Sequence, residues 1–116
     1  MKYTILVYES ETDFSARTDA GRKDAYWDAY RAYTRALMDA GVMVGGAGLQ
    51  PPPSATTVRQ RNSKRLVQDG PYAEVKEQVG GFYVVDVPNL DQALEWAAKC
   101  PAAGRAGVEV RPNLAM

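Results

Sequence analysis

The sequence contains no histidine among its 116 residues, and Cys100 is its only cysteine. The missing histidines exclude Ser–His and Cys–His nucleophile pairs, zinc sites with histidine ligands, and proton transfer by imidazole. A single cysteine cannot form a disulfide within the chain. Any catalysis therefore has to use carboxylates, lysine, tyrosine, arginine or backbone groups.

An excess of charge and a long apolar segment are also missing. Fourteen basic residues balance fourteen acidic ones, so the formal net charge is zero. We expect no nucleic-acid partner, because such a partner needs a concentrated positive surface. No apolar run approaches the length of a membrane span, and the N-terminal segment 1–8 is typical of a strand rather than a signal peptide. These observations predict a cytoplasmic protein without membrane association.

The size and composition of the chain predict one folded domain over residues 1–116. Apolar residues make up 46% of the sequence, which is enough for a hydrophobic core. The glycine-rich segment 45–48 lacks the lysine and the following helix of a phosphate-binding loop. The carboxylates lack the clustered spacing of a metal site. We therefore expect neither a cofactor nor a metal ion.

Hydrophobic periodicity locates the first half of the fold. Residues 2–8 alternate as a strand, with Tyr3, Ile5 and Val7 on one face. Residues 9–21 are polar and are expected to form a loop. A helix is predicted over 22–40, followed by a strand over 42–47 whose glycines indicate a bulge or a close backbone approach. The buried stripe of this helix is expected to consist of Tyr26, Tyr30, Tyr33 and Leu37.

The second half is predicted to contain a hairpin, two strands and a helix. The hairpin has arms 56–61 and 64–68, which are joined by Asn62-Ser63. A strand follows over 82–87, and the last strand spans 107–111. Asn89 is placed to cap the helix between these strands, and Pro101 to end it. The buried stripe of this second helix is expected to be Leu90, Ala93, Leu94 and Ala97.

This order of elements indicates an α+β fold of the ferredoxin-like class, a split β-α-β with an inserted hairpin. Both helices would cover one face of an antiparallel sheet. The other face, which carries Thr4, Leu6 and Tyr8, would be left open and would need a cover. The simplest cover is a second copy of the chain, so we expect a homodimer.

The segment 69–77 gathers four charged side chains around a Gly70-Pro71 turn, directly before an apolar strand. One interpretation is a ligand site, in which Lys76 would bind an anion. The other is a structural turn stabilised by Asp69, with the remaining charges exposed to solvent. Both interpretations remain open for the candidate residues of this segment, which are Asp69, Tyr72, Glu74 and Lys76.

The last strand supplies two further candidates, Glu109 and Arg111. If Val108 and Val110 face the helices, these two charged residues face the open side of the sheet. Arg111 would then pair with Glu109, with Asp69, or with the carboxylate of a ligand. We hypothesise that Asp69 and Arg111 line one cleft that binds an anionic molecule. The alternative is a purely structural ion pair.

Several stretches resemble the YCII-related family, in its DGPF-domain branch. The strongest is the segment 68–82, QDGPYAEVKEQVGGF, supported by the segments 1–8, 48–51, 55–59 and 108–112. Tyr72 stands where the family has phenylalanine. The wider family also has a histidine on its first helix, and this chain has only aromatic residues there. A mechanism that uses this histidine therefore cannot be transferred to this chain.

The resemblance implies a dimeric α/β-barrel with a site in a cleft beside the barrel. It implies no particular reaction, since the family is largely uncharacterised. We therefore expect the binding of a small anionic metabolite, with histidine-independent enzymatic activity as an additional possibility. The alternative function is a non-catalytic regulatory module that acts with an extracytoplasmic-function sigma factor, because genes of this branch are often neighbours of such factors.

Overall fold

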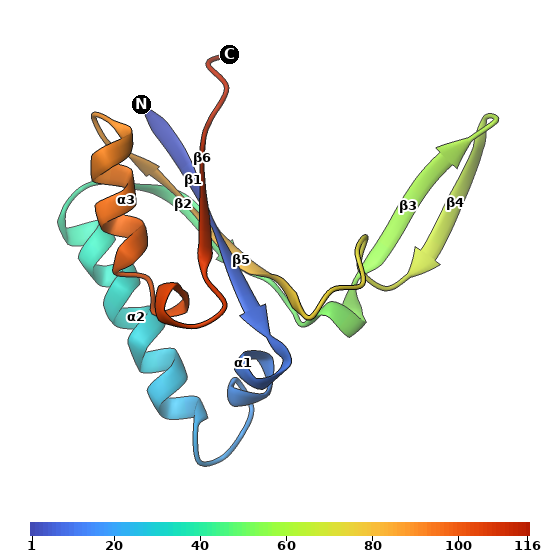
Figure 1. Ribbon diagram of the computed structural model, residues 1–116, viewed down its shortest axis with the longest axis horizontal. Helices are drawn as coiled ribbons and strands as arrows, with labels where there is room; N and C mark the ends of the chain where they lie inside the picture. The colour runs from blue at the N-terminus through green and yellow to red at the C-terminus, as the bar shows by residue number, and fades with distance from the viewer.

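The computed structural model describes all residues from 1 to 116 and shows an α+β chain built on a four-stranded antiparallel sheet (Figure 1). The strand order is β2-β5-β1-β6, which is consistent with a ferredoxin-like split β-α-β. The strands are β1 (Lys2–Ser10), β2 (Met43–Gly48), β5 (Glu77–Asp86) and β6 (Val108–Pro112). A separate two-stranded sheet pairs β3 (Thr56–Arg61) with β4 (Lys64–Asp69).

Two long helices, α2 (Lys23–Asp39) and α3 (Leu90–Ala98), cover one face of the four-stranded sheet (Figure 1). The pairing of the strands determines which side chains meet these helices. Ile5 lies opposite Val110 on one side and Tyr83 on the other, so all three face the helices. The core combines this face with Leu37 of α2 and Ala93 of α3. Leu6 and the residues beside it point to the opposite face, which no element of the chain covers.

Several predicted features are confirmed by local geometry. Asn62 and Ser63 both have positive φ angles, as a tight two-residue hairpin turn requires. The Asn89 side chain accepts a hydrogen bond from the backbone N–H of Gln92 and so caps α3. The strand β2 has an irregularity at Val44, and a side chain at Gly46 would overlap the backbone carbonyl of Phe82.

The expected loop over residues 9–21 was wrong in its first part. Glu9 and Ser10 continue β1, and a short helix, α1 (Glu11–Ala16), follows directly. Ser10 caps α1 because its hydroxyl accepts from the Asp13 backbone N–H, while the Asp13 carboxylate accepts from the Ser10 backbone N–H. Two one-turn 3₁₀ helices, η1 (Pro52–Ser54) and η2 (Pro101–Gly104), complete the chain.

Two further expectations need correction. The strand β5 begins at Glu77 instead of residue 82, because Gly80 forms a bulge that extends the pairing with β1. The buried stripe of α3 excludes Leu90 and Leu94, which are both nearly half exposed. The buried stripe is formed by the small side chains of Ala93 and Ala97, with Trp96 beside them and Cys100 buried just beyond the end of the helix.

Candidate functional site

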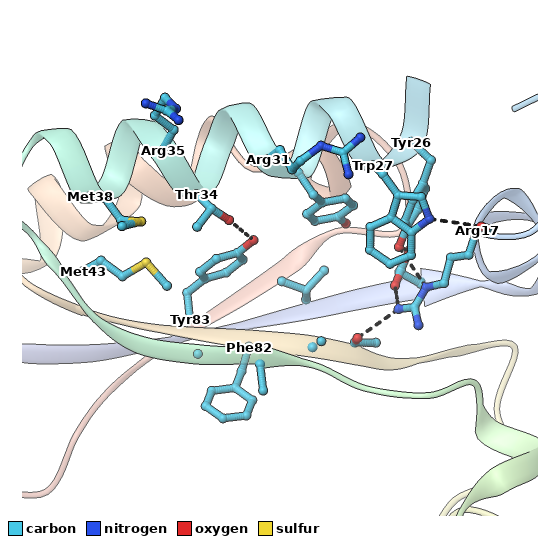
Figure 2. Close-up of a pocket in the computed structure, with 18 of the residues that line it drawn as sticks. Arg17, Tyr26, Trp27, Arg31, Thr34, Arg35, Met38, Met43, Phe82 and Tyr83 are labelled. Atoms are coloured by element: carbon cyan, nitrogen blue, oxygen red, sulfur yellow. Dashed lines mark hydrogen bonds and ion pairs between the residues drawn. The ribbon is translucent and has the colours of Figure 1, made fainter. Parts of the chain in front are cut away.

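A cavity lies between α2 and the helix-facing side of β2 and β5 (Figure 2). Its volume is about 560 Å³. Aromatic rings and methionines form most of its side-chain surface. Met38 and Met43 lie at one end, and the guanidinium group of Arg17 lies at the other. The Phe82 side chain points to the opposite side of the sheet, so this residue contributes only its backbone.

Glycines create this cavity. Gly46 and Gly48 on β2 lie opposite Tyr83 and Gly81 on β5, which places them on the side of the sheet that faces α2. Three of these four positions carry no side chain, so the space under the helix stays unfilled. A Cβ atom at Gly48 would meet nothing within 4 Å. The missing side chains at these positions thus leave room for a small molecule between α2 and the sheet.

A buried ion pair closes the Arg17 end of the cavity. Glu9 is 2% exposed, and its carboxylate lies 2.5 Å from the Arg17 guanidinium. The Tyr26 hydroxyl donates to the other carboxylate oxygen of Glu9. Arg17 also donates to the Tyr26 hydroxyl, at 3.0 Å, and to the backbone carbonyls of Leu49 and Gly80. Every hydrogen-bonding group of this cluster therefore has a partner inside the chain.

The environment of this cluster shifts two pKa values. Burial lowers the pKa of Arg17, but hydrogen bonds to Glu9 and Tyr26 outweigh burial and raise it above its ordinary value. Burial, followed by the hydrogen bond to Glu9, raises the pKa of Tyr26. Arg17 thus stays charged and Tyr26 stays neutral at any physiological pH. The rings of Phe14, Tyr26 and Trp27 surround the guanidinium at 4.9 to 5.8 Å and exclude water from it.

The wall formed by α2 offers polar atoms to a ligand. Tyr30 lines the cavity and its hydroxyl makes no hydrogen bond within the chain, while burial raises the pKa of this phenol, so it remains a donor. The Thr34 and Tyr83 hydroxyls lie 3.0 Å apart and connect the helix to the sheet (Figure 2). Among the hydroxyls of this wall, that of Tyr30 is therefore the one without a partner in the chain.

Two arginines lie one helical turn apart at the mouth of the cavity. Arg31 pairs at 2.7 Å with Asp28, and both side chains are largely exposed. Arg35 is among the lining residues and forms no ion pair within the chain, and its guanidinium points away from the sheet in Figure 2. Asp39 carries the one carboxylate at this rim. With Glu9 neutralised by Arg17, the lining arginines Arg31 and Arg35 outnumber the Asp39 carboxylate by one charge, which Asp28 balances as long as it stays paired with Arg31.

The structure brings two of the predicted site residues together on the open face of the sheet. Arg111 donates to Glu109 at 2.6 Å, and the Tyr8 hydroxyl donates to the same carboxylate at 3.1 Å. The hydrogen bond from Arg111, followed by that from Tyr8, lowers the pKa of Glu109. Burial, together with the contact to Glu109, raises the pKa of Tyr8. Among the partners considered for Arg111, Glu109 is the one found within the chain.

The other four predicted residues lie elsewhere. Asp69 ends β4, and Tyr72, Glu74 and Lys76 follow in the loop that leads to β5. Tyr72 is 78% exposed, with the Arg59 guanidinium 5.0 Å from the centre of its ring. Within one chain, Asp69 and Arg111 belong to different sheets and make no contact with each other. The cavity under α2 contains none of the six predicted residues.

Sequence reasoning missed Glu9 and Arg17, although the pattern of β1 contained a signal for the first. The inward positions of β1 are Tyr3, Ile5 and Val7, and the same alternation places Glu9 on that face. A carboxylate there has to be buried and therefore has to find a partner. Arg17 could not be identified as that partner, because α1 itself was not predicted.

Comparisons with known proteins show the family of this chain. The YCII-related domain matches residues 1–116. The chain belongs to the YCII-related family. A relative in Rhizobium meliloti (strain 1021), the uncharacterised protein R00369, is 36% identical over 116 residues, which cover 97% of this chain and 91% of that protein. The family is thus shown over the whole chain, whereas the assignment to the DGPF branch stays a prediction.

Proposed function

We propose that the protein binds a small anionic molecule with an apolar or aromatic body in the cavity under α2. The observation that carries this proposal is an apolar cavity of about 560 Å³ with Arg31 and Arg35 at its mouth. This volume lies in the range of small-molecule sites, which combine apolar walls with a few placed polar groups.

The apolar walls suit the body of the ligand. Trp27 and Tyr30 offer ring surfaces on the helix side, and the glycines of β2 and β5 form a flat floor. A planar ring would lie between these two surfaces with its faces covered. The Tyr30 hydroxyl would then donate to a polar atom of the ligand, since no group of the chain occupies it.

The charges at the mouth suit a carboxylate or phosphate. Arg35 has no carboxylate partner, and Arg31 can exchange its exposed contact with Asp28 for an anion. A planar guanidinium binds such groups through two parallel hydrogen bonds. Arg17 is less suitable, because its donors already bind Glu9, Tyr26 and backbone carbonyls. The anionic group of the ligand is therefore expected at the mouth and its apolar part inside.

Binding is better supported than catalysis. Glu9 is the carboxylate at the inner end, and both of its oxygens already accept hydrogen bonds from Arg17 and Tyr26. A general base needs a free lone pair within reach of the proton that it removes. Histidine-independent activity thus stays a prediction without a named catalytic residue. The role with a sigma factor also stays a prediction, which co-purification of the two proteins would test.

The proposal is tested by calorimetry and thermal shift with benzoate, phenylacetate and phenyl phosphate as probes and benzamide as the neutral control. A ligand that binds only the folded state raises the melting temperature. We expect stabilisation by at least one anion and less by benzamide. Replacing Arg31 and Arg35 by alanine should abolish this difference, while the control variant Lys23→Ala/Lys99→Ala retains it. Equal effects of anions and benzamide, or unchanged binding to the arginine variant, would refute the proposal.

A further inference from the structure

The β3–β4 hairpin, defined here as the arm (residues 56–69), projects from the body of the chain (Figure 1). Its strands pair only with each other and form no ladder with the four-stranded sheet. Both outer edges of the arm therefore expose backbone groups that no strand pairs with. A two-stranded ribbon is marginally stable in water at best, and a third strand would stabilise it.

The hydrogen-bond pattern of the arm shows which backbone groups of β3 point outward. At the base of the arm, the Gly70 N–H donates to the Ala55 carbonyl at 2.7 Å, so these two residues form a hydrogen-bonded pair. Along an antiparallel ladder, such pairs alternate with pairs that are not hydrogen-bonded. The register places Thr56, Val58 and Gln60 in the second kind of pair. Their N–H and C=O groups therefore point away from β4 and are free to bond an added strand.

The two faces of β3 differ in chemistry. On one face Val58 lies opposite Val67, and the two side chains are 60% and 57% exposed. The other face carries Arg59 and Arg61, whose Cα atoms lie about 7 Å apart along the strand. Every second residue of an added strand has the same spacing. The side chains of such a strand would therefore lie beside the two arginines on one face and beside Val58 on the other.

The arm carries an excess of positive charge. It contains four basic residues and one acidic residue, which leaves an excess of three positive charges. None of the four basic side chains forms an ion pair within the chain. A hollow of about 300 Å³ lies on the face of the two arginines, and the Tyr72 ring lies 5.0 Å from the Arg59 guanidinium. This face therefore suits carboxylate groups. The four basic residues are Arg59, Arg61, Lys64 and Arg65.

We propose that the outer edge of β3 binds an extended acidic peptide segment of a partner protein by strand addition. The backbone of the segment bonds to the outward N–H and C=O groups of β3. Its acidic residues pair with Arg59 and Arg61, and the apolar residues that alternate with them cover Val58. This site shares no residue with the cavity under α2, so it does not depend on the ligand proposed there.

Two other occupants match this edge less well. A second arm carries the same excess of positive charge, so two arms repel each other. A single-stranded nucleic acid would find the arginines, but its sugar–phosphate backbone cannot continue the hydrogen-bond ladder of β3. Because the whole chain has a formal net charge of zero, the residues outside the arm carry an excess of three negative charges. This charge repels a long polyanion that extends past the arm.

The first experiment follows the fluorescence anisotropy of labelled peptides at low salt. The wild type should bind EVEVEVE at least about tenfold more tightly than two control peptides. These are KVKVKVK, which has the opposite charge, and EVEPEVE, whose central proline interrupts the strand. Absence of binding to EVEVEVE, or equal binding of either control peptide, would refute the proposal. Tighter binding of oligothymidylate than of EVEVEVE would also refute it and would identify single-stranded nucleic acid as the partner.

Charge reversal in the arm tests the role of the two arginines. Arg59→Glu/Arg61→Glu should weaken the binding of EVEVEVE by about tenfold or more and should strengthen that of KVKVKVK. The matched control Lys23→Glu/Lys99→Glu changes the net charge by the same amount outside the arm and should keep the preference of the wild type. A control that loses this preference, or an arm variant that keeps it, would contradict the proposal.

A proline in β3 tests whether the backbone of this edge takes part. Gln60→Pro removes an N–H that points outward, so the pairing with β4 stays intact, and it should weaken the binding of EVEVEVE by about tenfold or more. Gln60→Ala removes the same side chain but keeps the N–H, and it should bind as the wild type does. Hydrogen exchange should show that EVEVEVE protects the amide of Val58 but not that of Val67 on β4. Equal binding by the two Gln60 variants, or protection of Val67 in place of Val58, would overturn the proposal.

Discussion

Gly80 on β5 lies so close to the buried carboxylate of Glu9 on β1 that a Cβ atom at position 80 would overlap Glu9 Oε1. The same atom would lie 3.0 Å from a terminal nitrogen of Arg17. Glu9 cannot move away, because Arg17 and Tyr26 both hold it. Glycine at position 80 thus leaves the space that the carboxylate of the buried ion pair occupies.

We expect Gly80→Ala to lower the free energy of unfolding by about 1–3 kcal/mol, because the added methyl group overpacks the ion pair. Gly48→Ala is the matched control, since a Cβ atom there meets nothing within 4 Å. Urea unfolding at neutral pH measures both variants. Equal stability of the two would show that the Glu9 carboxylate has more freedom than its two partners, Arg17 and Tyr26, indicate.

The ion pair itself gives a second prediction. Arg17→Met leaves Glu9 buried without its cation and should lower the free energy of unfolding by about 3–5 kcal/mol. The double variant Glu9→Leu/Arg17→Met removes both charges and should recover a large part of this loss, because no buried charge remains. Urea unfolding of Arg17→Met, Glu9→Leu and the double variant measures the coupling free energy between the two residues. A double variant whose loss of stability equals the sum of the two single losses would contradict this prediction.

This cluster also shows how far the sequence could predict the site. Periodicity predicted the order of elements along the chain and the faces of β1 and β6, because alternation of side chains is a local property. The partners of Glu9 come from α1, α2 and β5, and no local pattern connects them. The cavity depends on the pairing of Gly48 with Gly81, so it could not be predicted before the strand register was known. The charged segment 69–77 was predicted as a candidate site because its charged residues are adjacent in sequence.

A pH titration tests the pair on β6. The hydrogen bond from Arg111, with that from Tyr8, holds the pKa of Glu109 below its ordinary value of 4.5. The stabilising contribution is therefore present above that value and is lost as the pH falls through the pKa of the folded state. Arg111→Ala should raise the pKa of Glu109, as measured by NMR of the side-chain carboxyl group. An unchanged pKa of Glu109 in this variant would contradict the pairing with Arg111.

Cys100 provides a second titration. Burial raises the pKa of this thiol to about 11 from an ordinary value of 9.0. At pH 8 the thiolate fraction is roughly a hundredfold smaller than in an exposed cysteine, so reaction with a disulfide reagent should be slow. Denaturation in urea should restore an ordinary rate. Because the folded pKa is the higher one, the neutral thiol favours the folded state below pH 9, and this contribution is lost as the pH rises through 11. Rapid modification of the folded protein would contradict the burial of Cys100.

Filling the cavity separates its role in binding from its role in stability. At Gly48 the backbone has an ordinary conformation and the Cβ position faces the empty cavity, so Gly48→Val adds a side chain there without overlap. We expect the free energy of unfolding to stay within about 0.5 kcal/mol, since valine suits a strand and displaces nothing.

Binding of the anionic probes should be lost in Gly48→Val, because the isopropyl group occupies the floor under Tyr30. Gly45→Val is the matched control on the same strand. Gly45 lies opposite Val84 on the open face, and a Cβ atom there also meets nothing within 4 Å. Calorimetry with phenylacetate should show binding to the wild type and to Gly45→Val, and none to Gly48→Val. Equal binding to all three proteins would place the ligand outside this cavity.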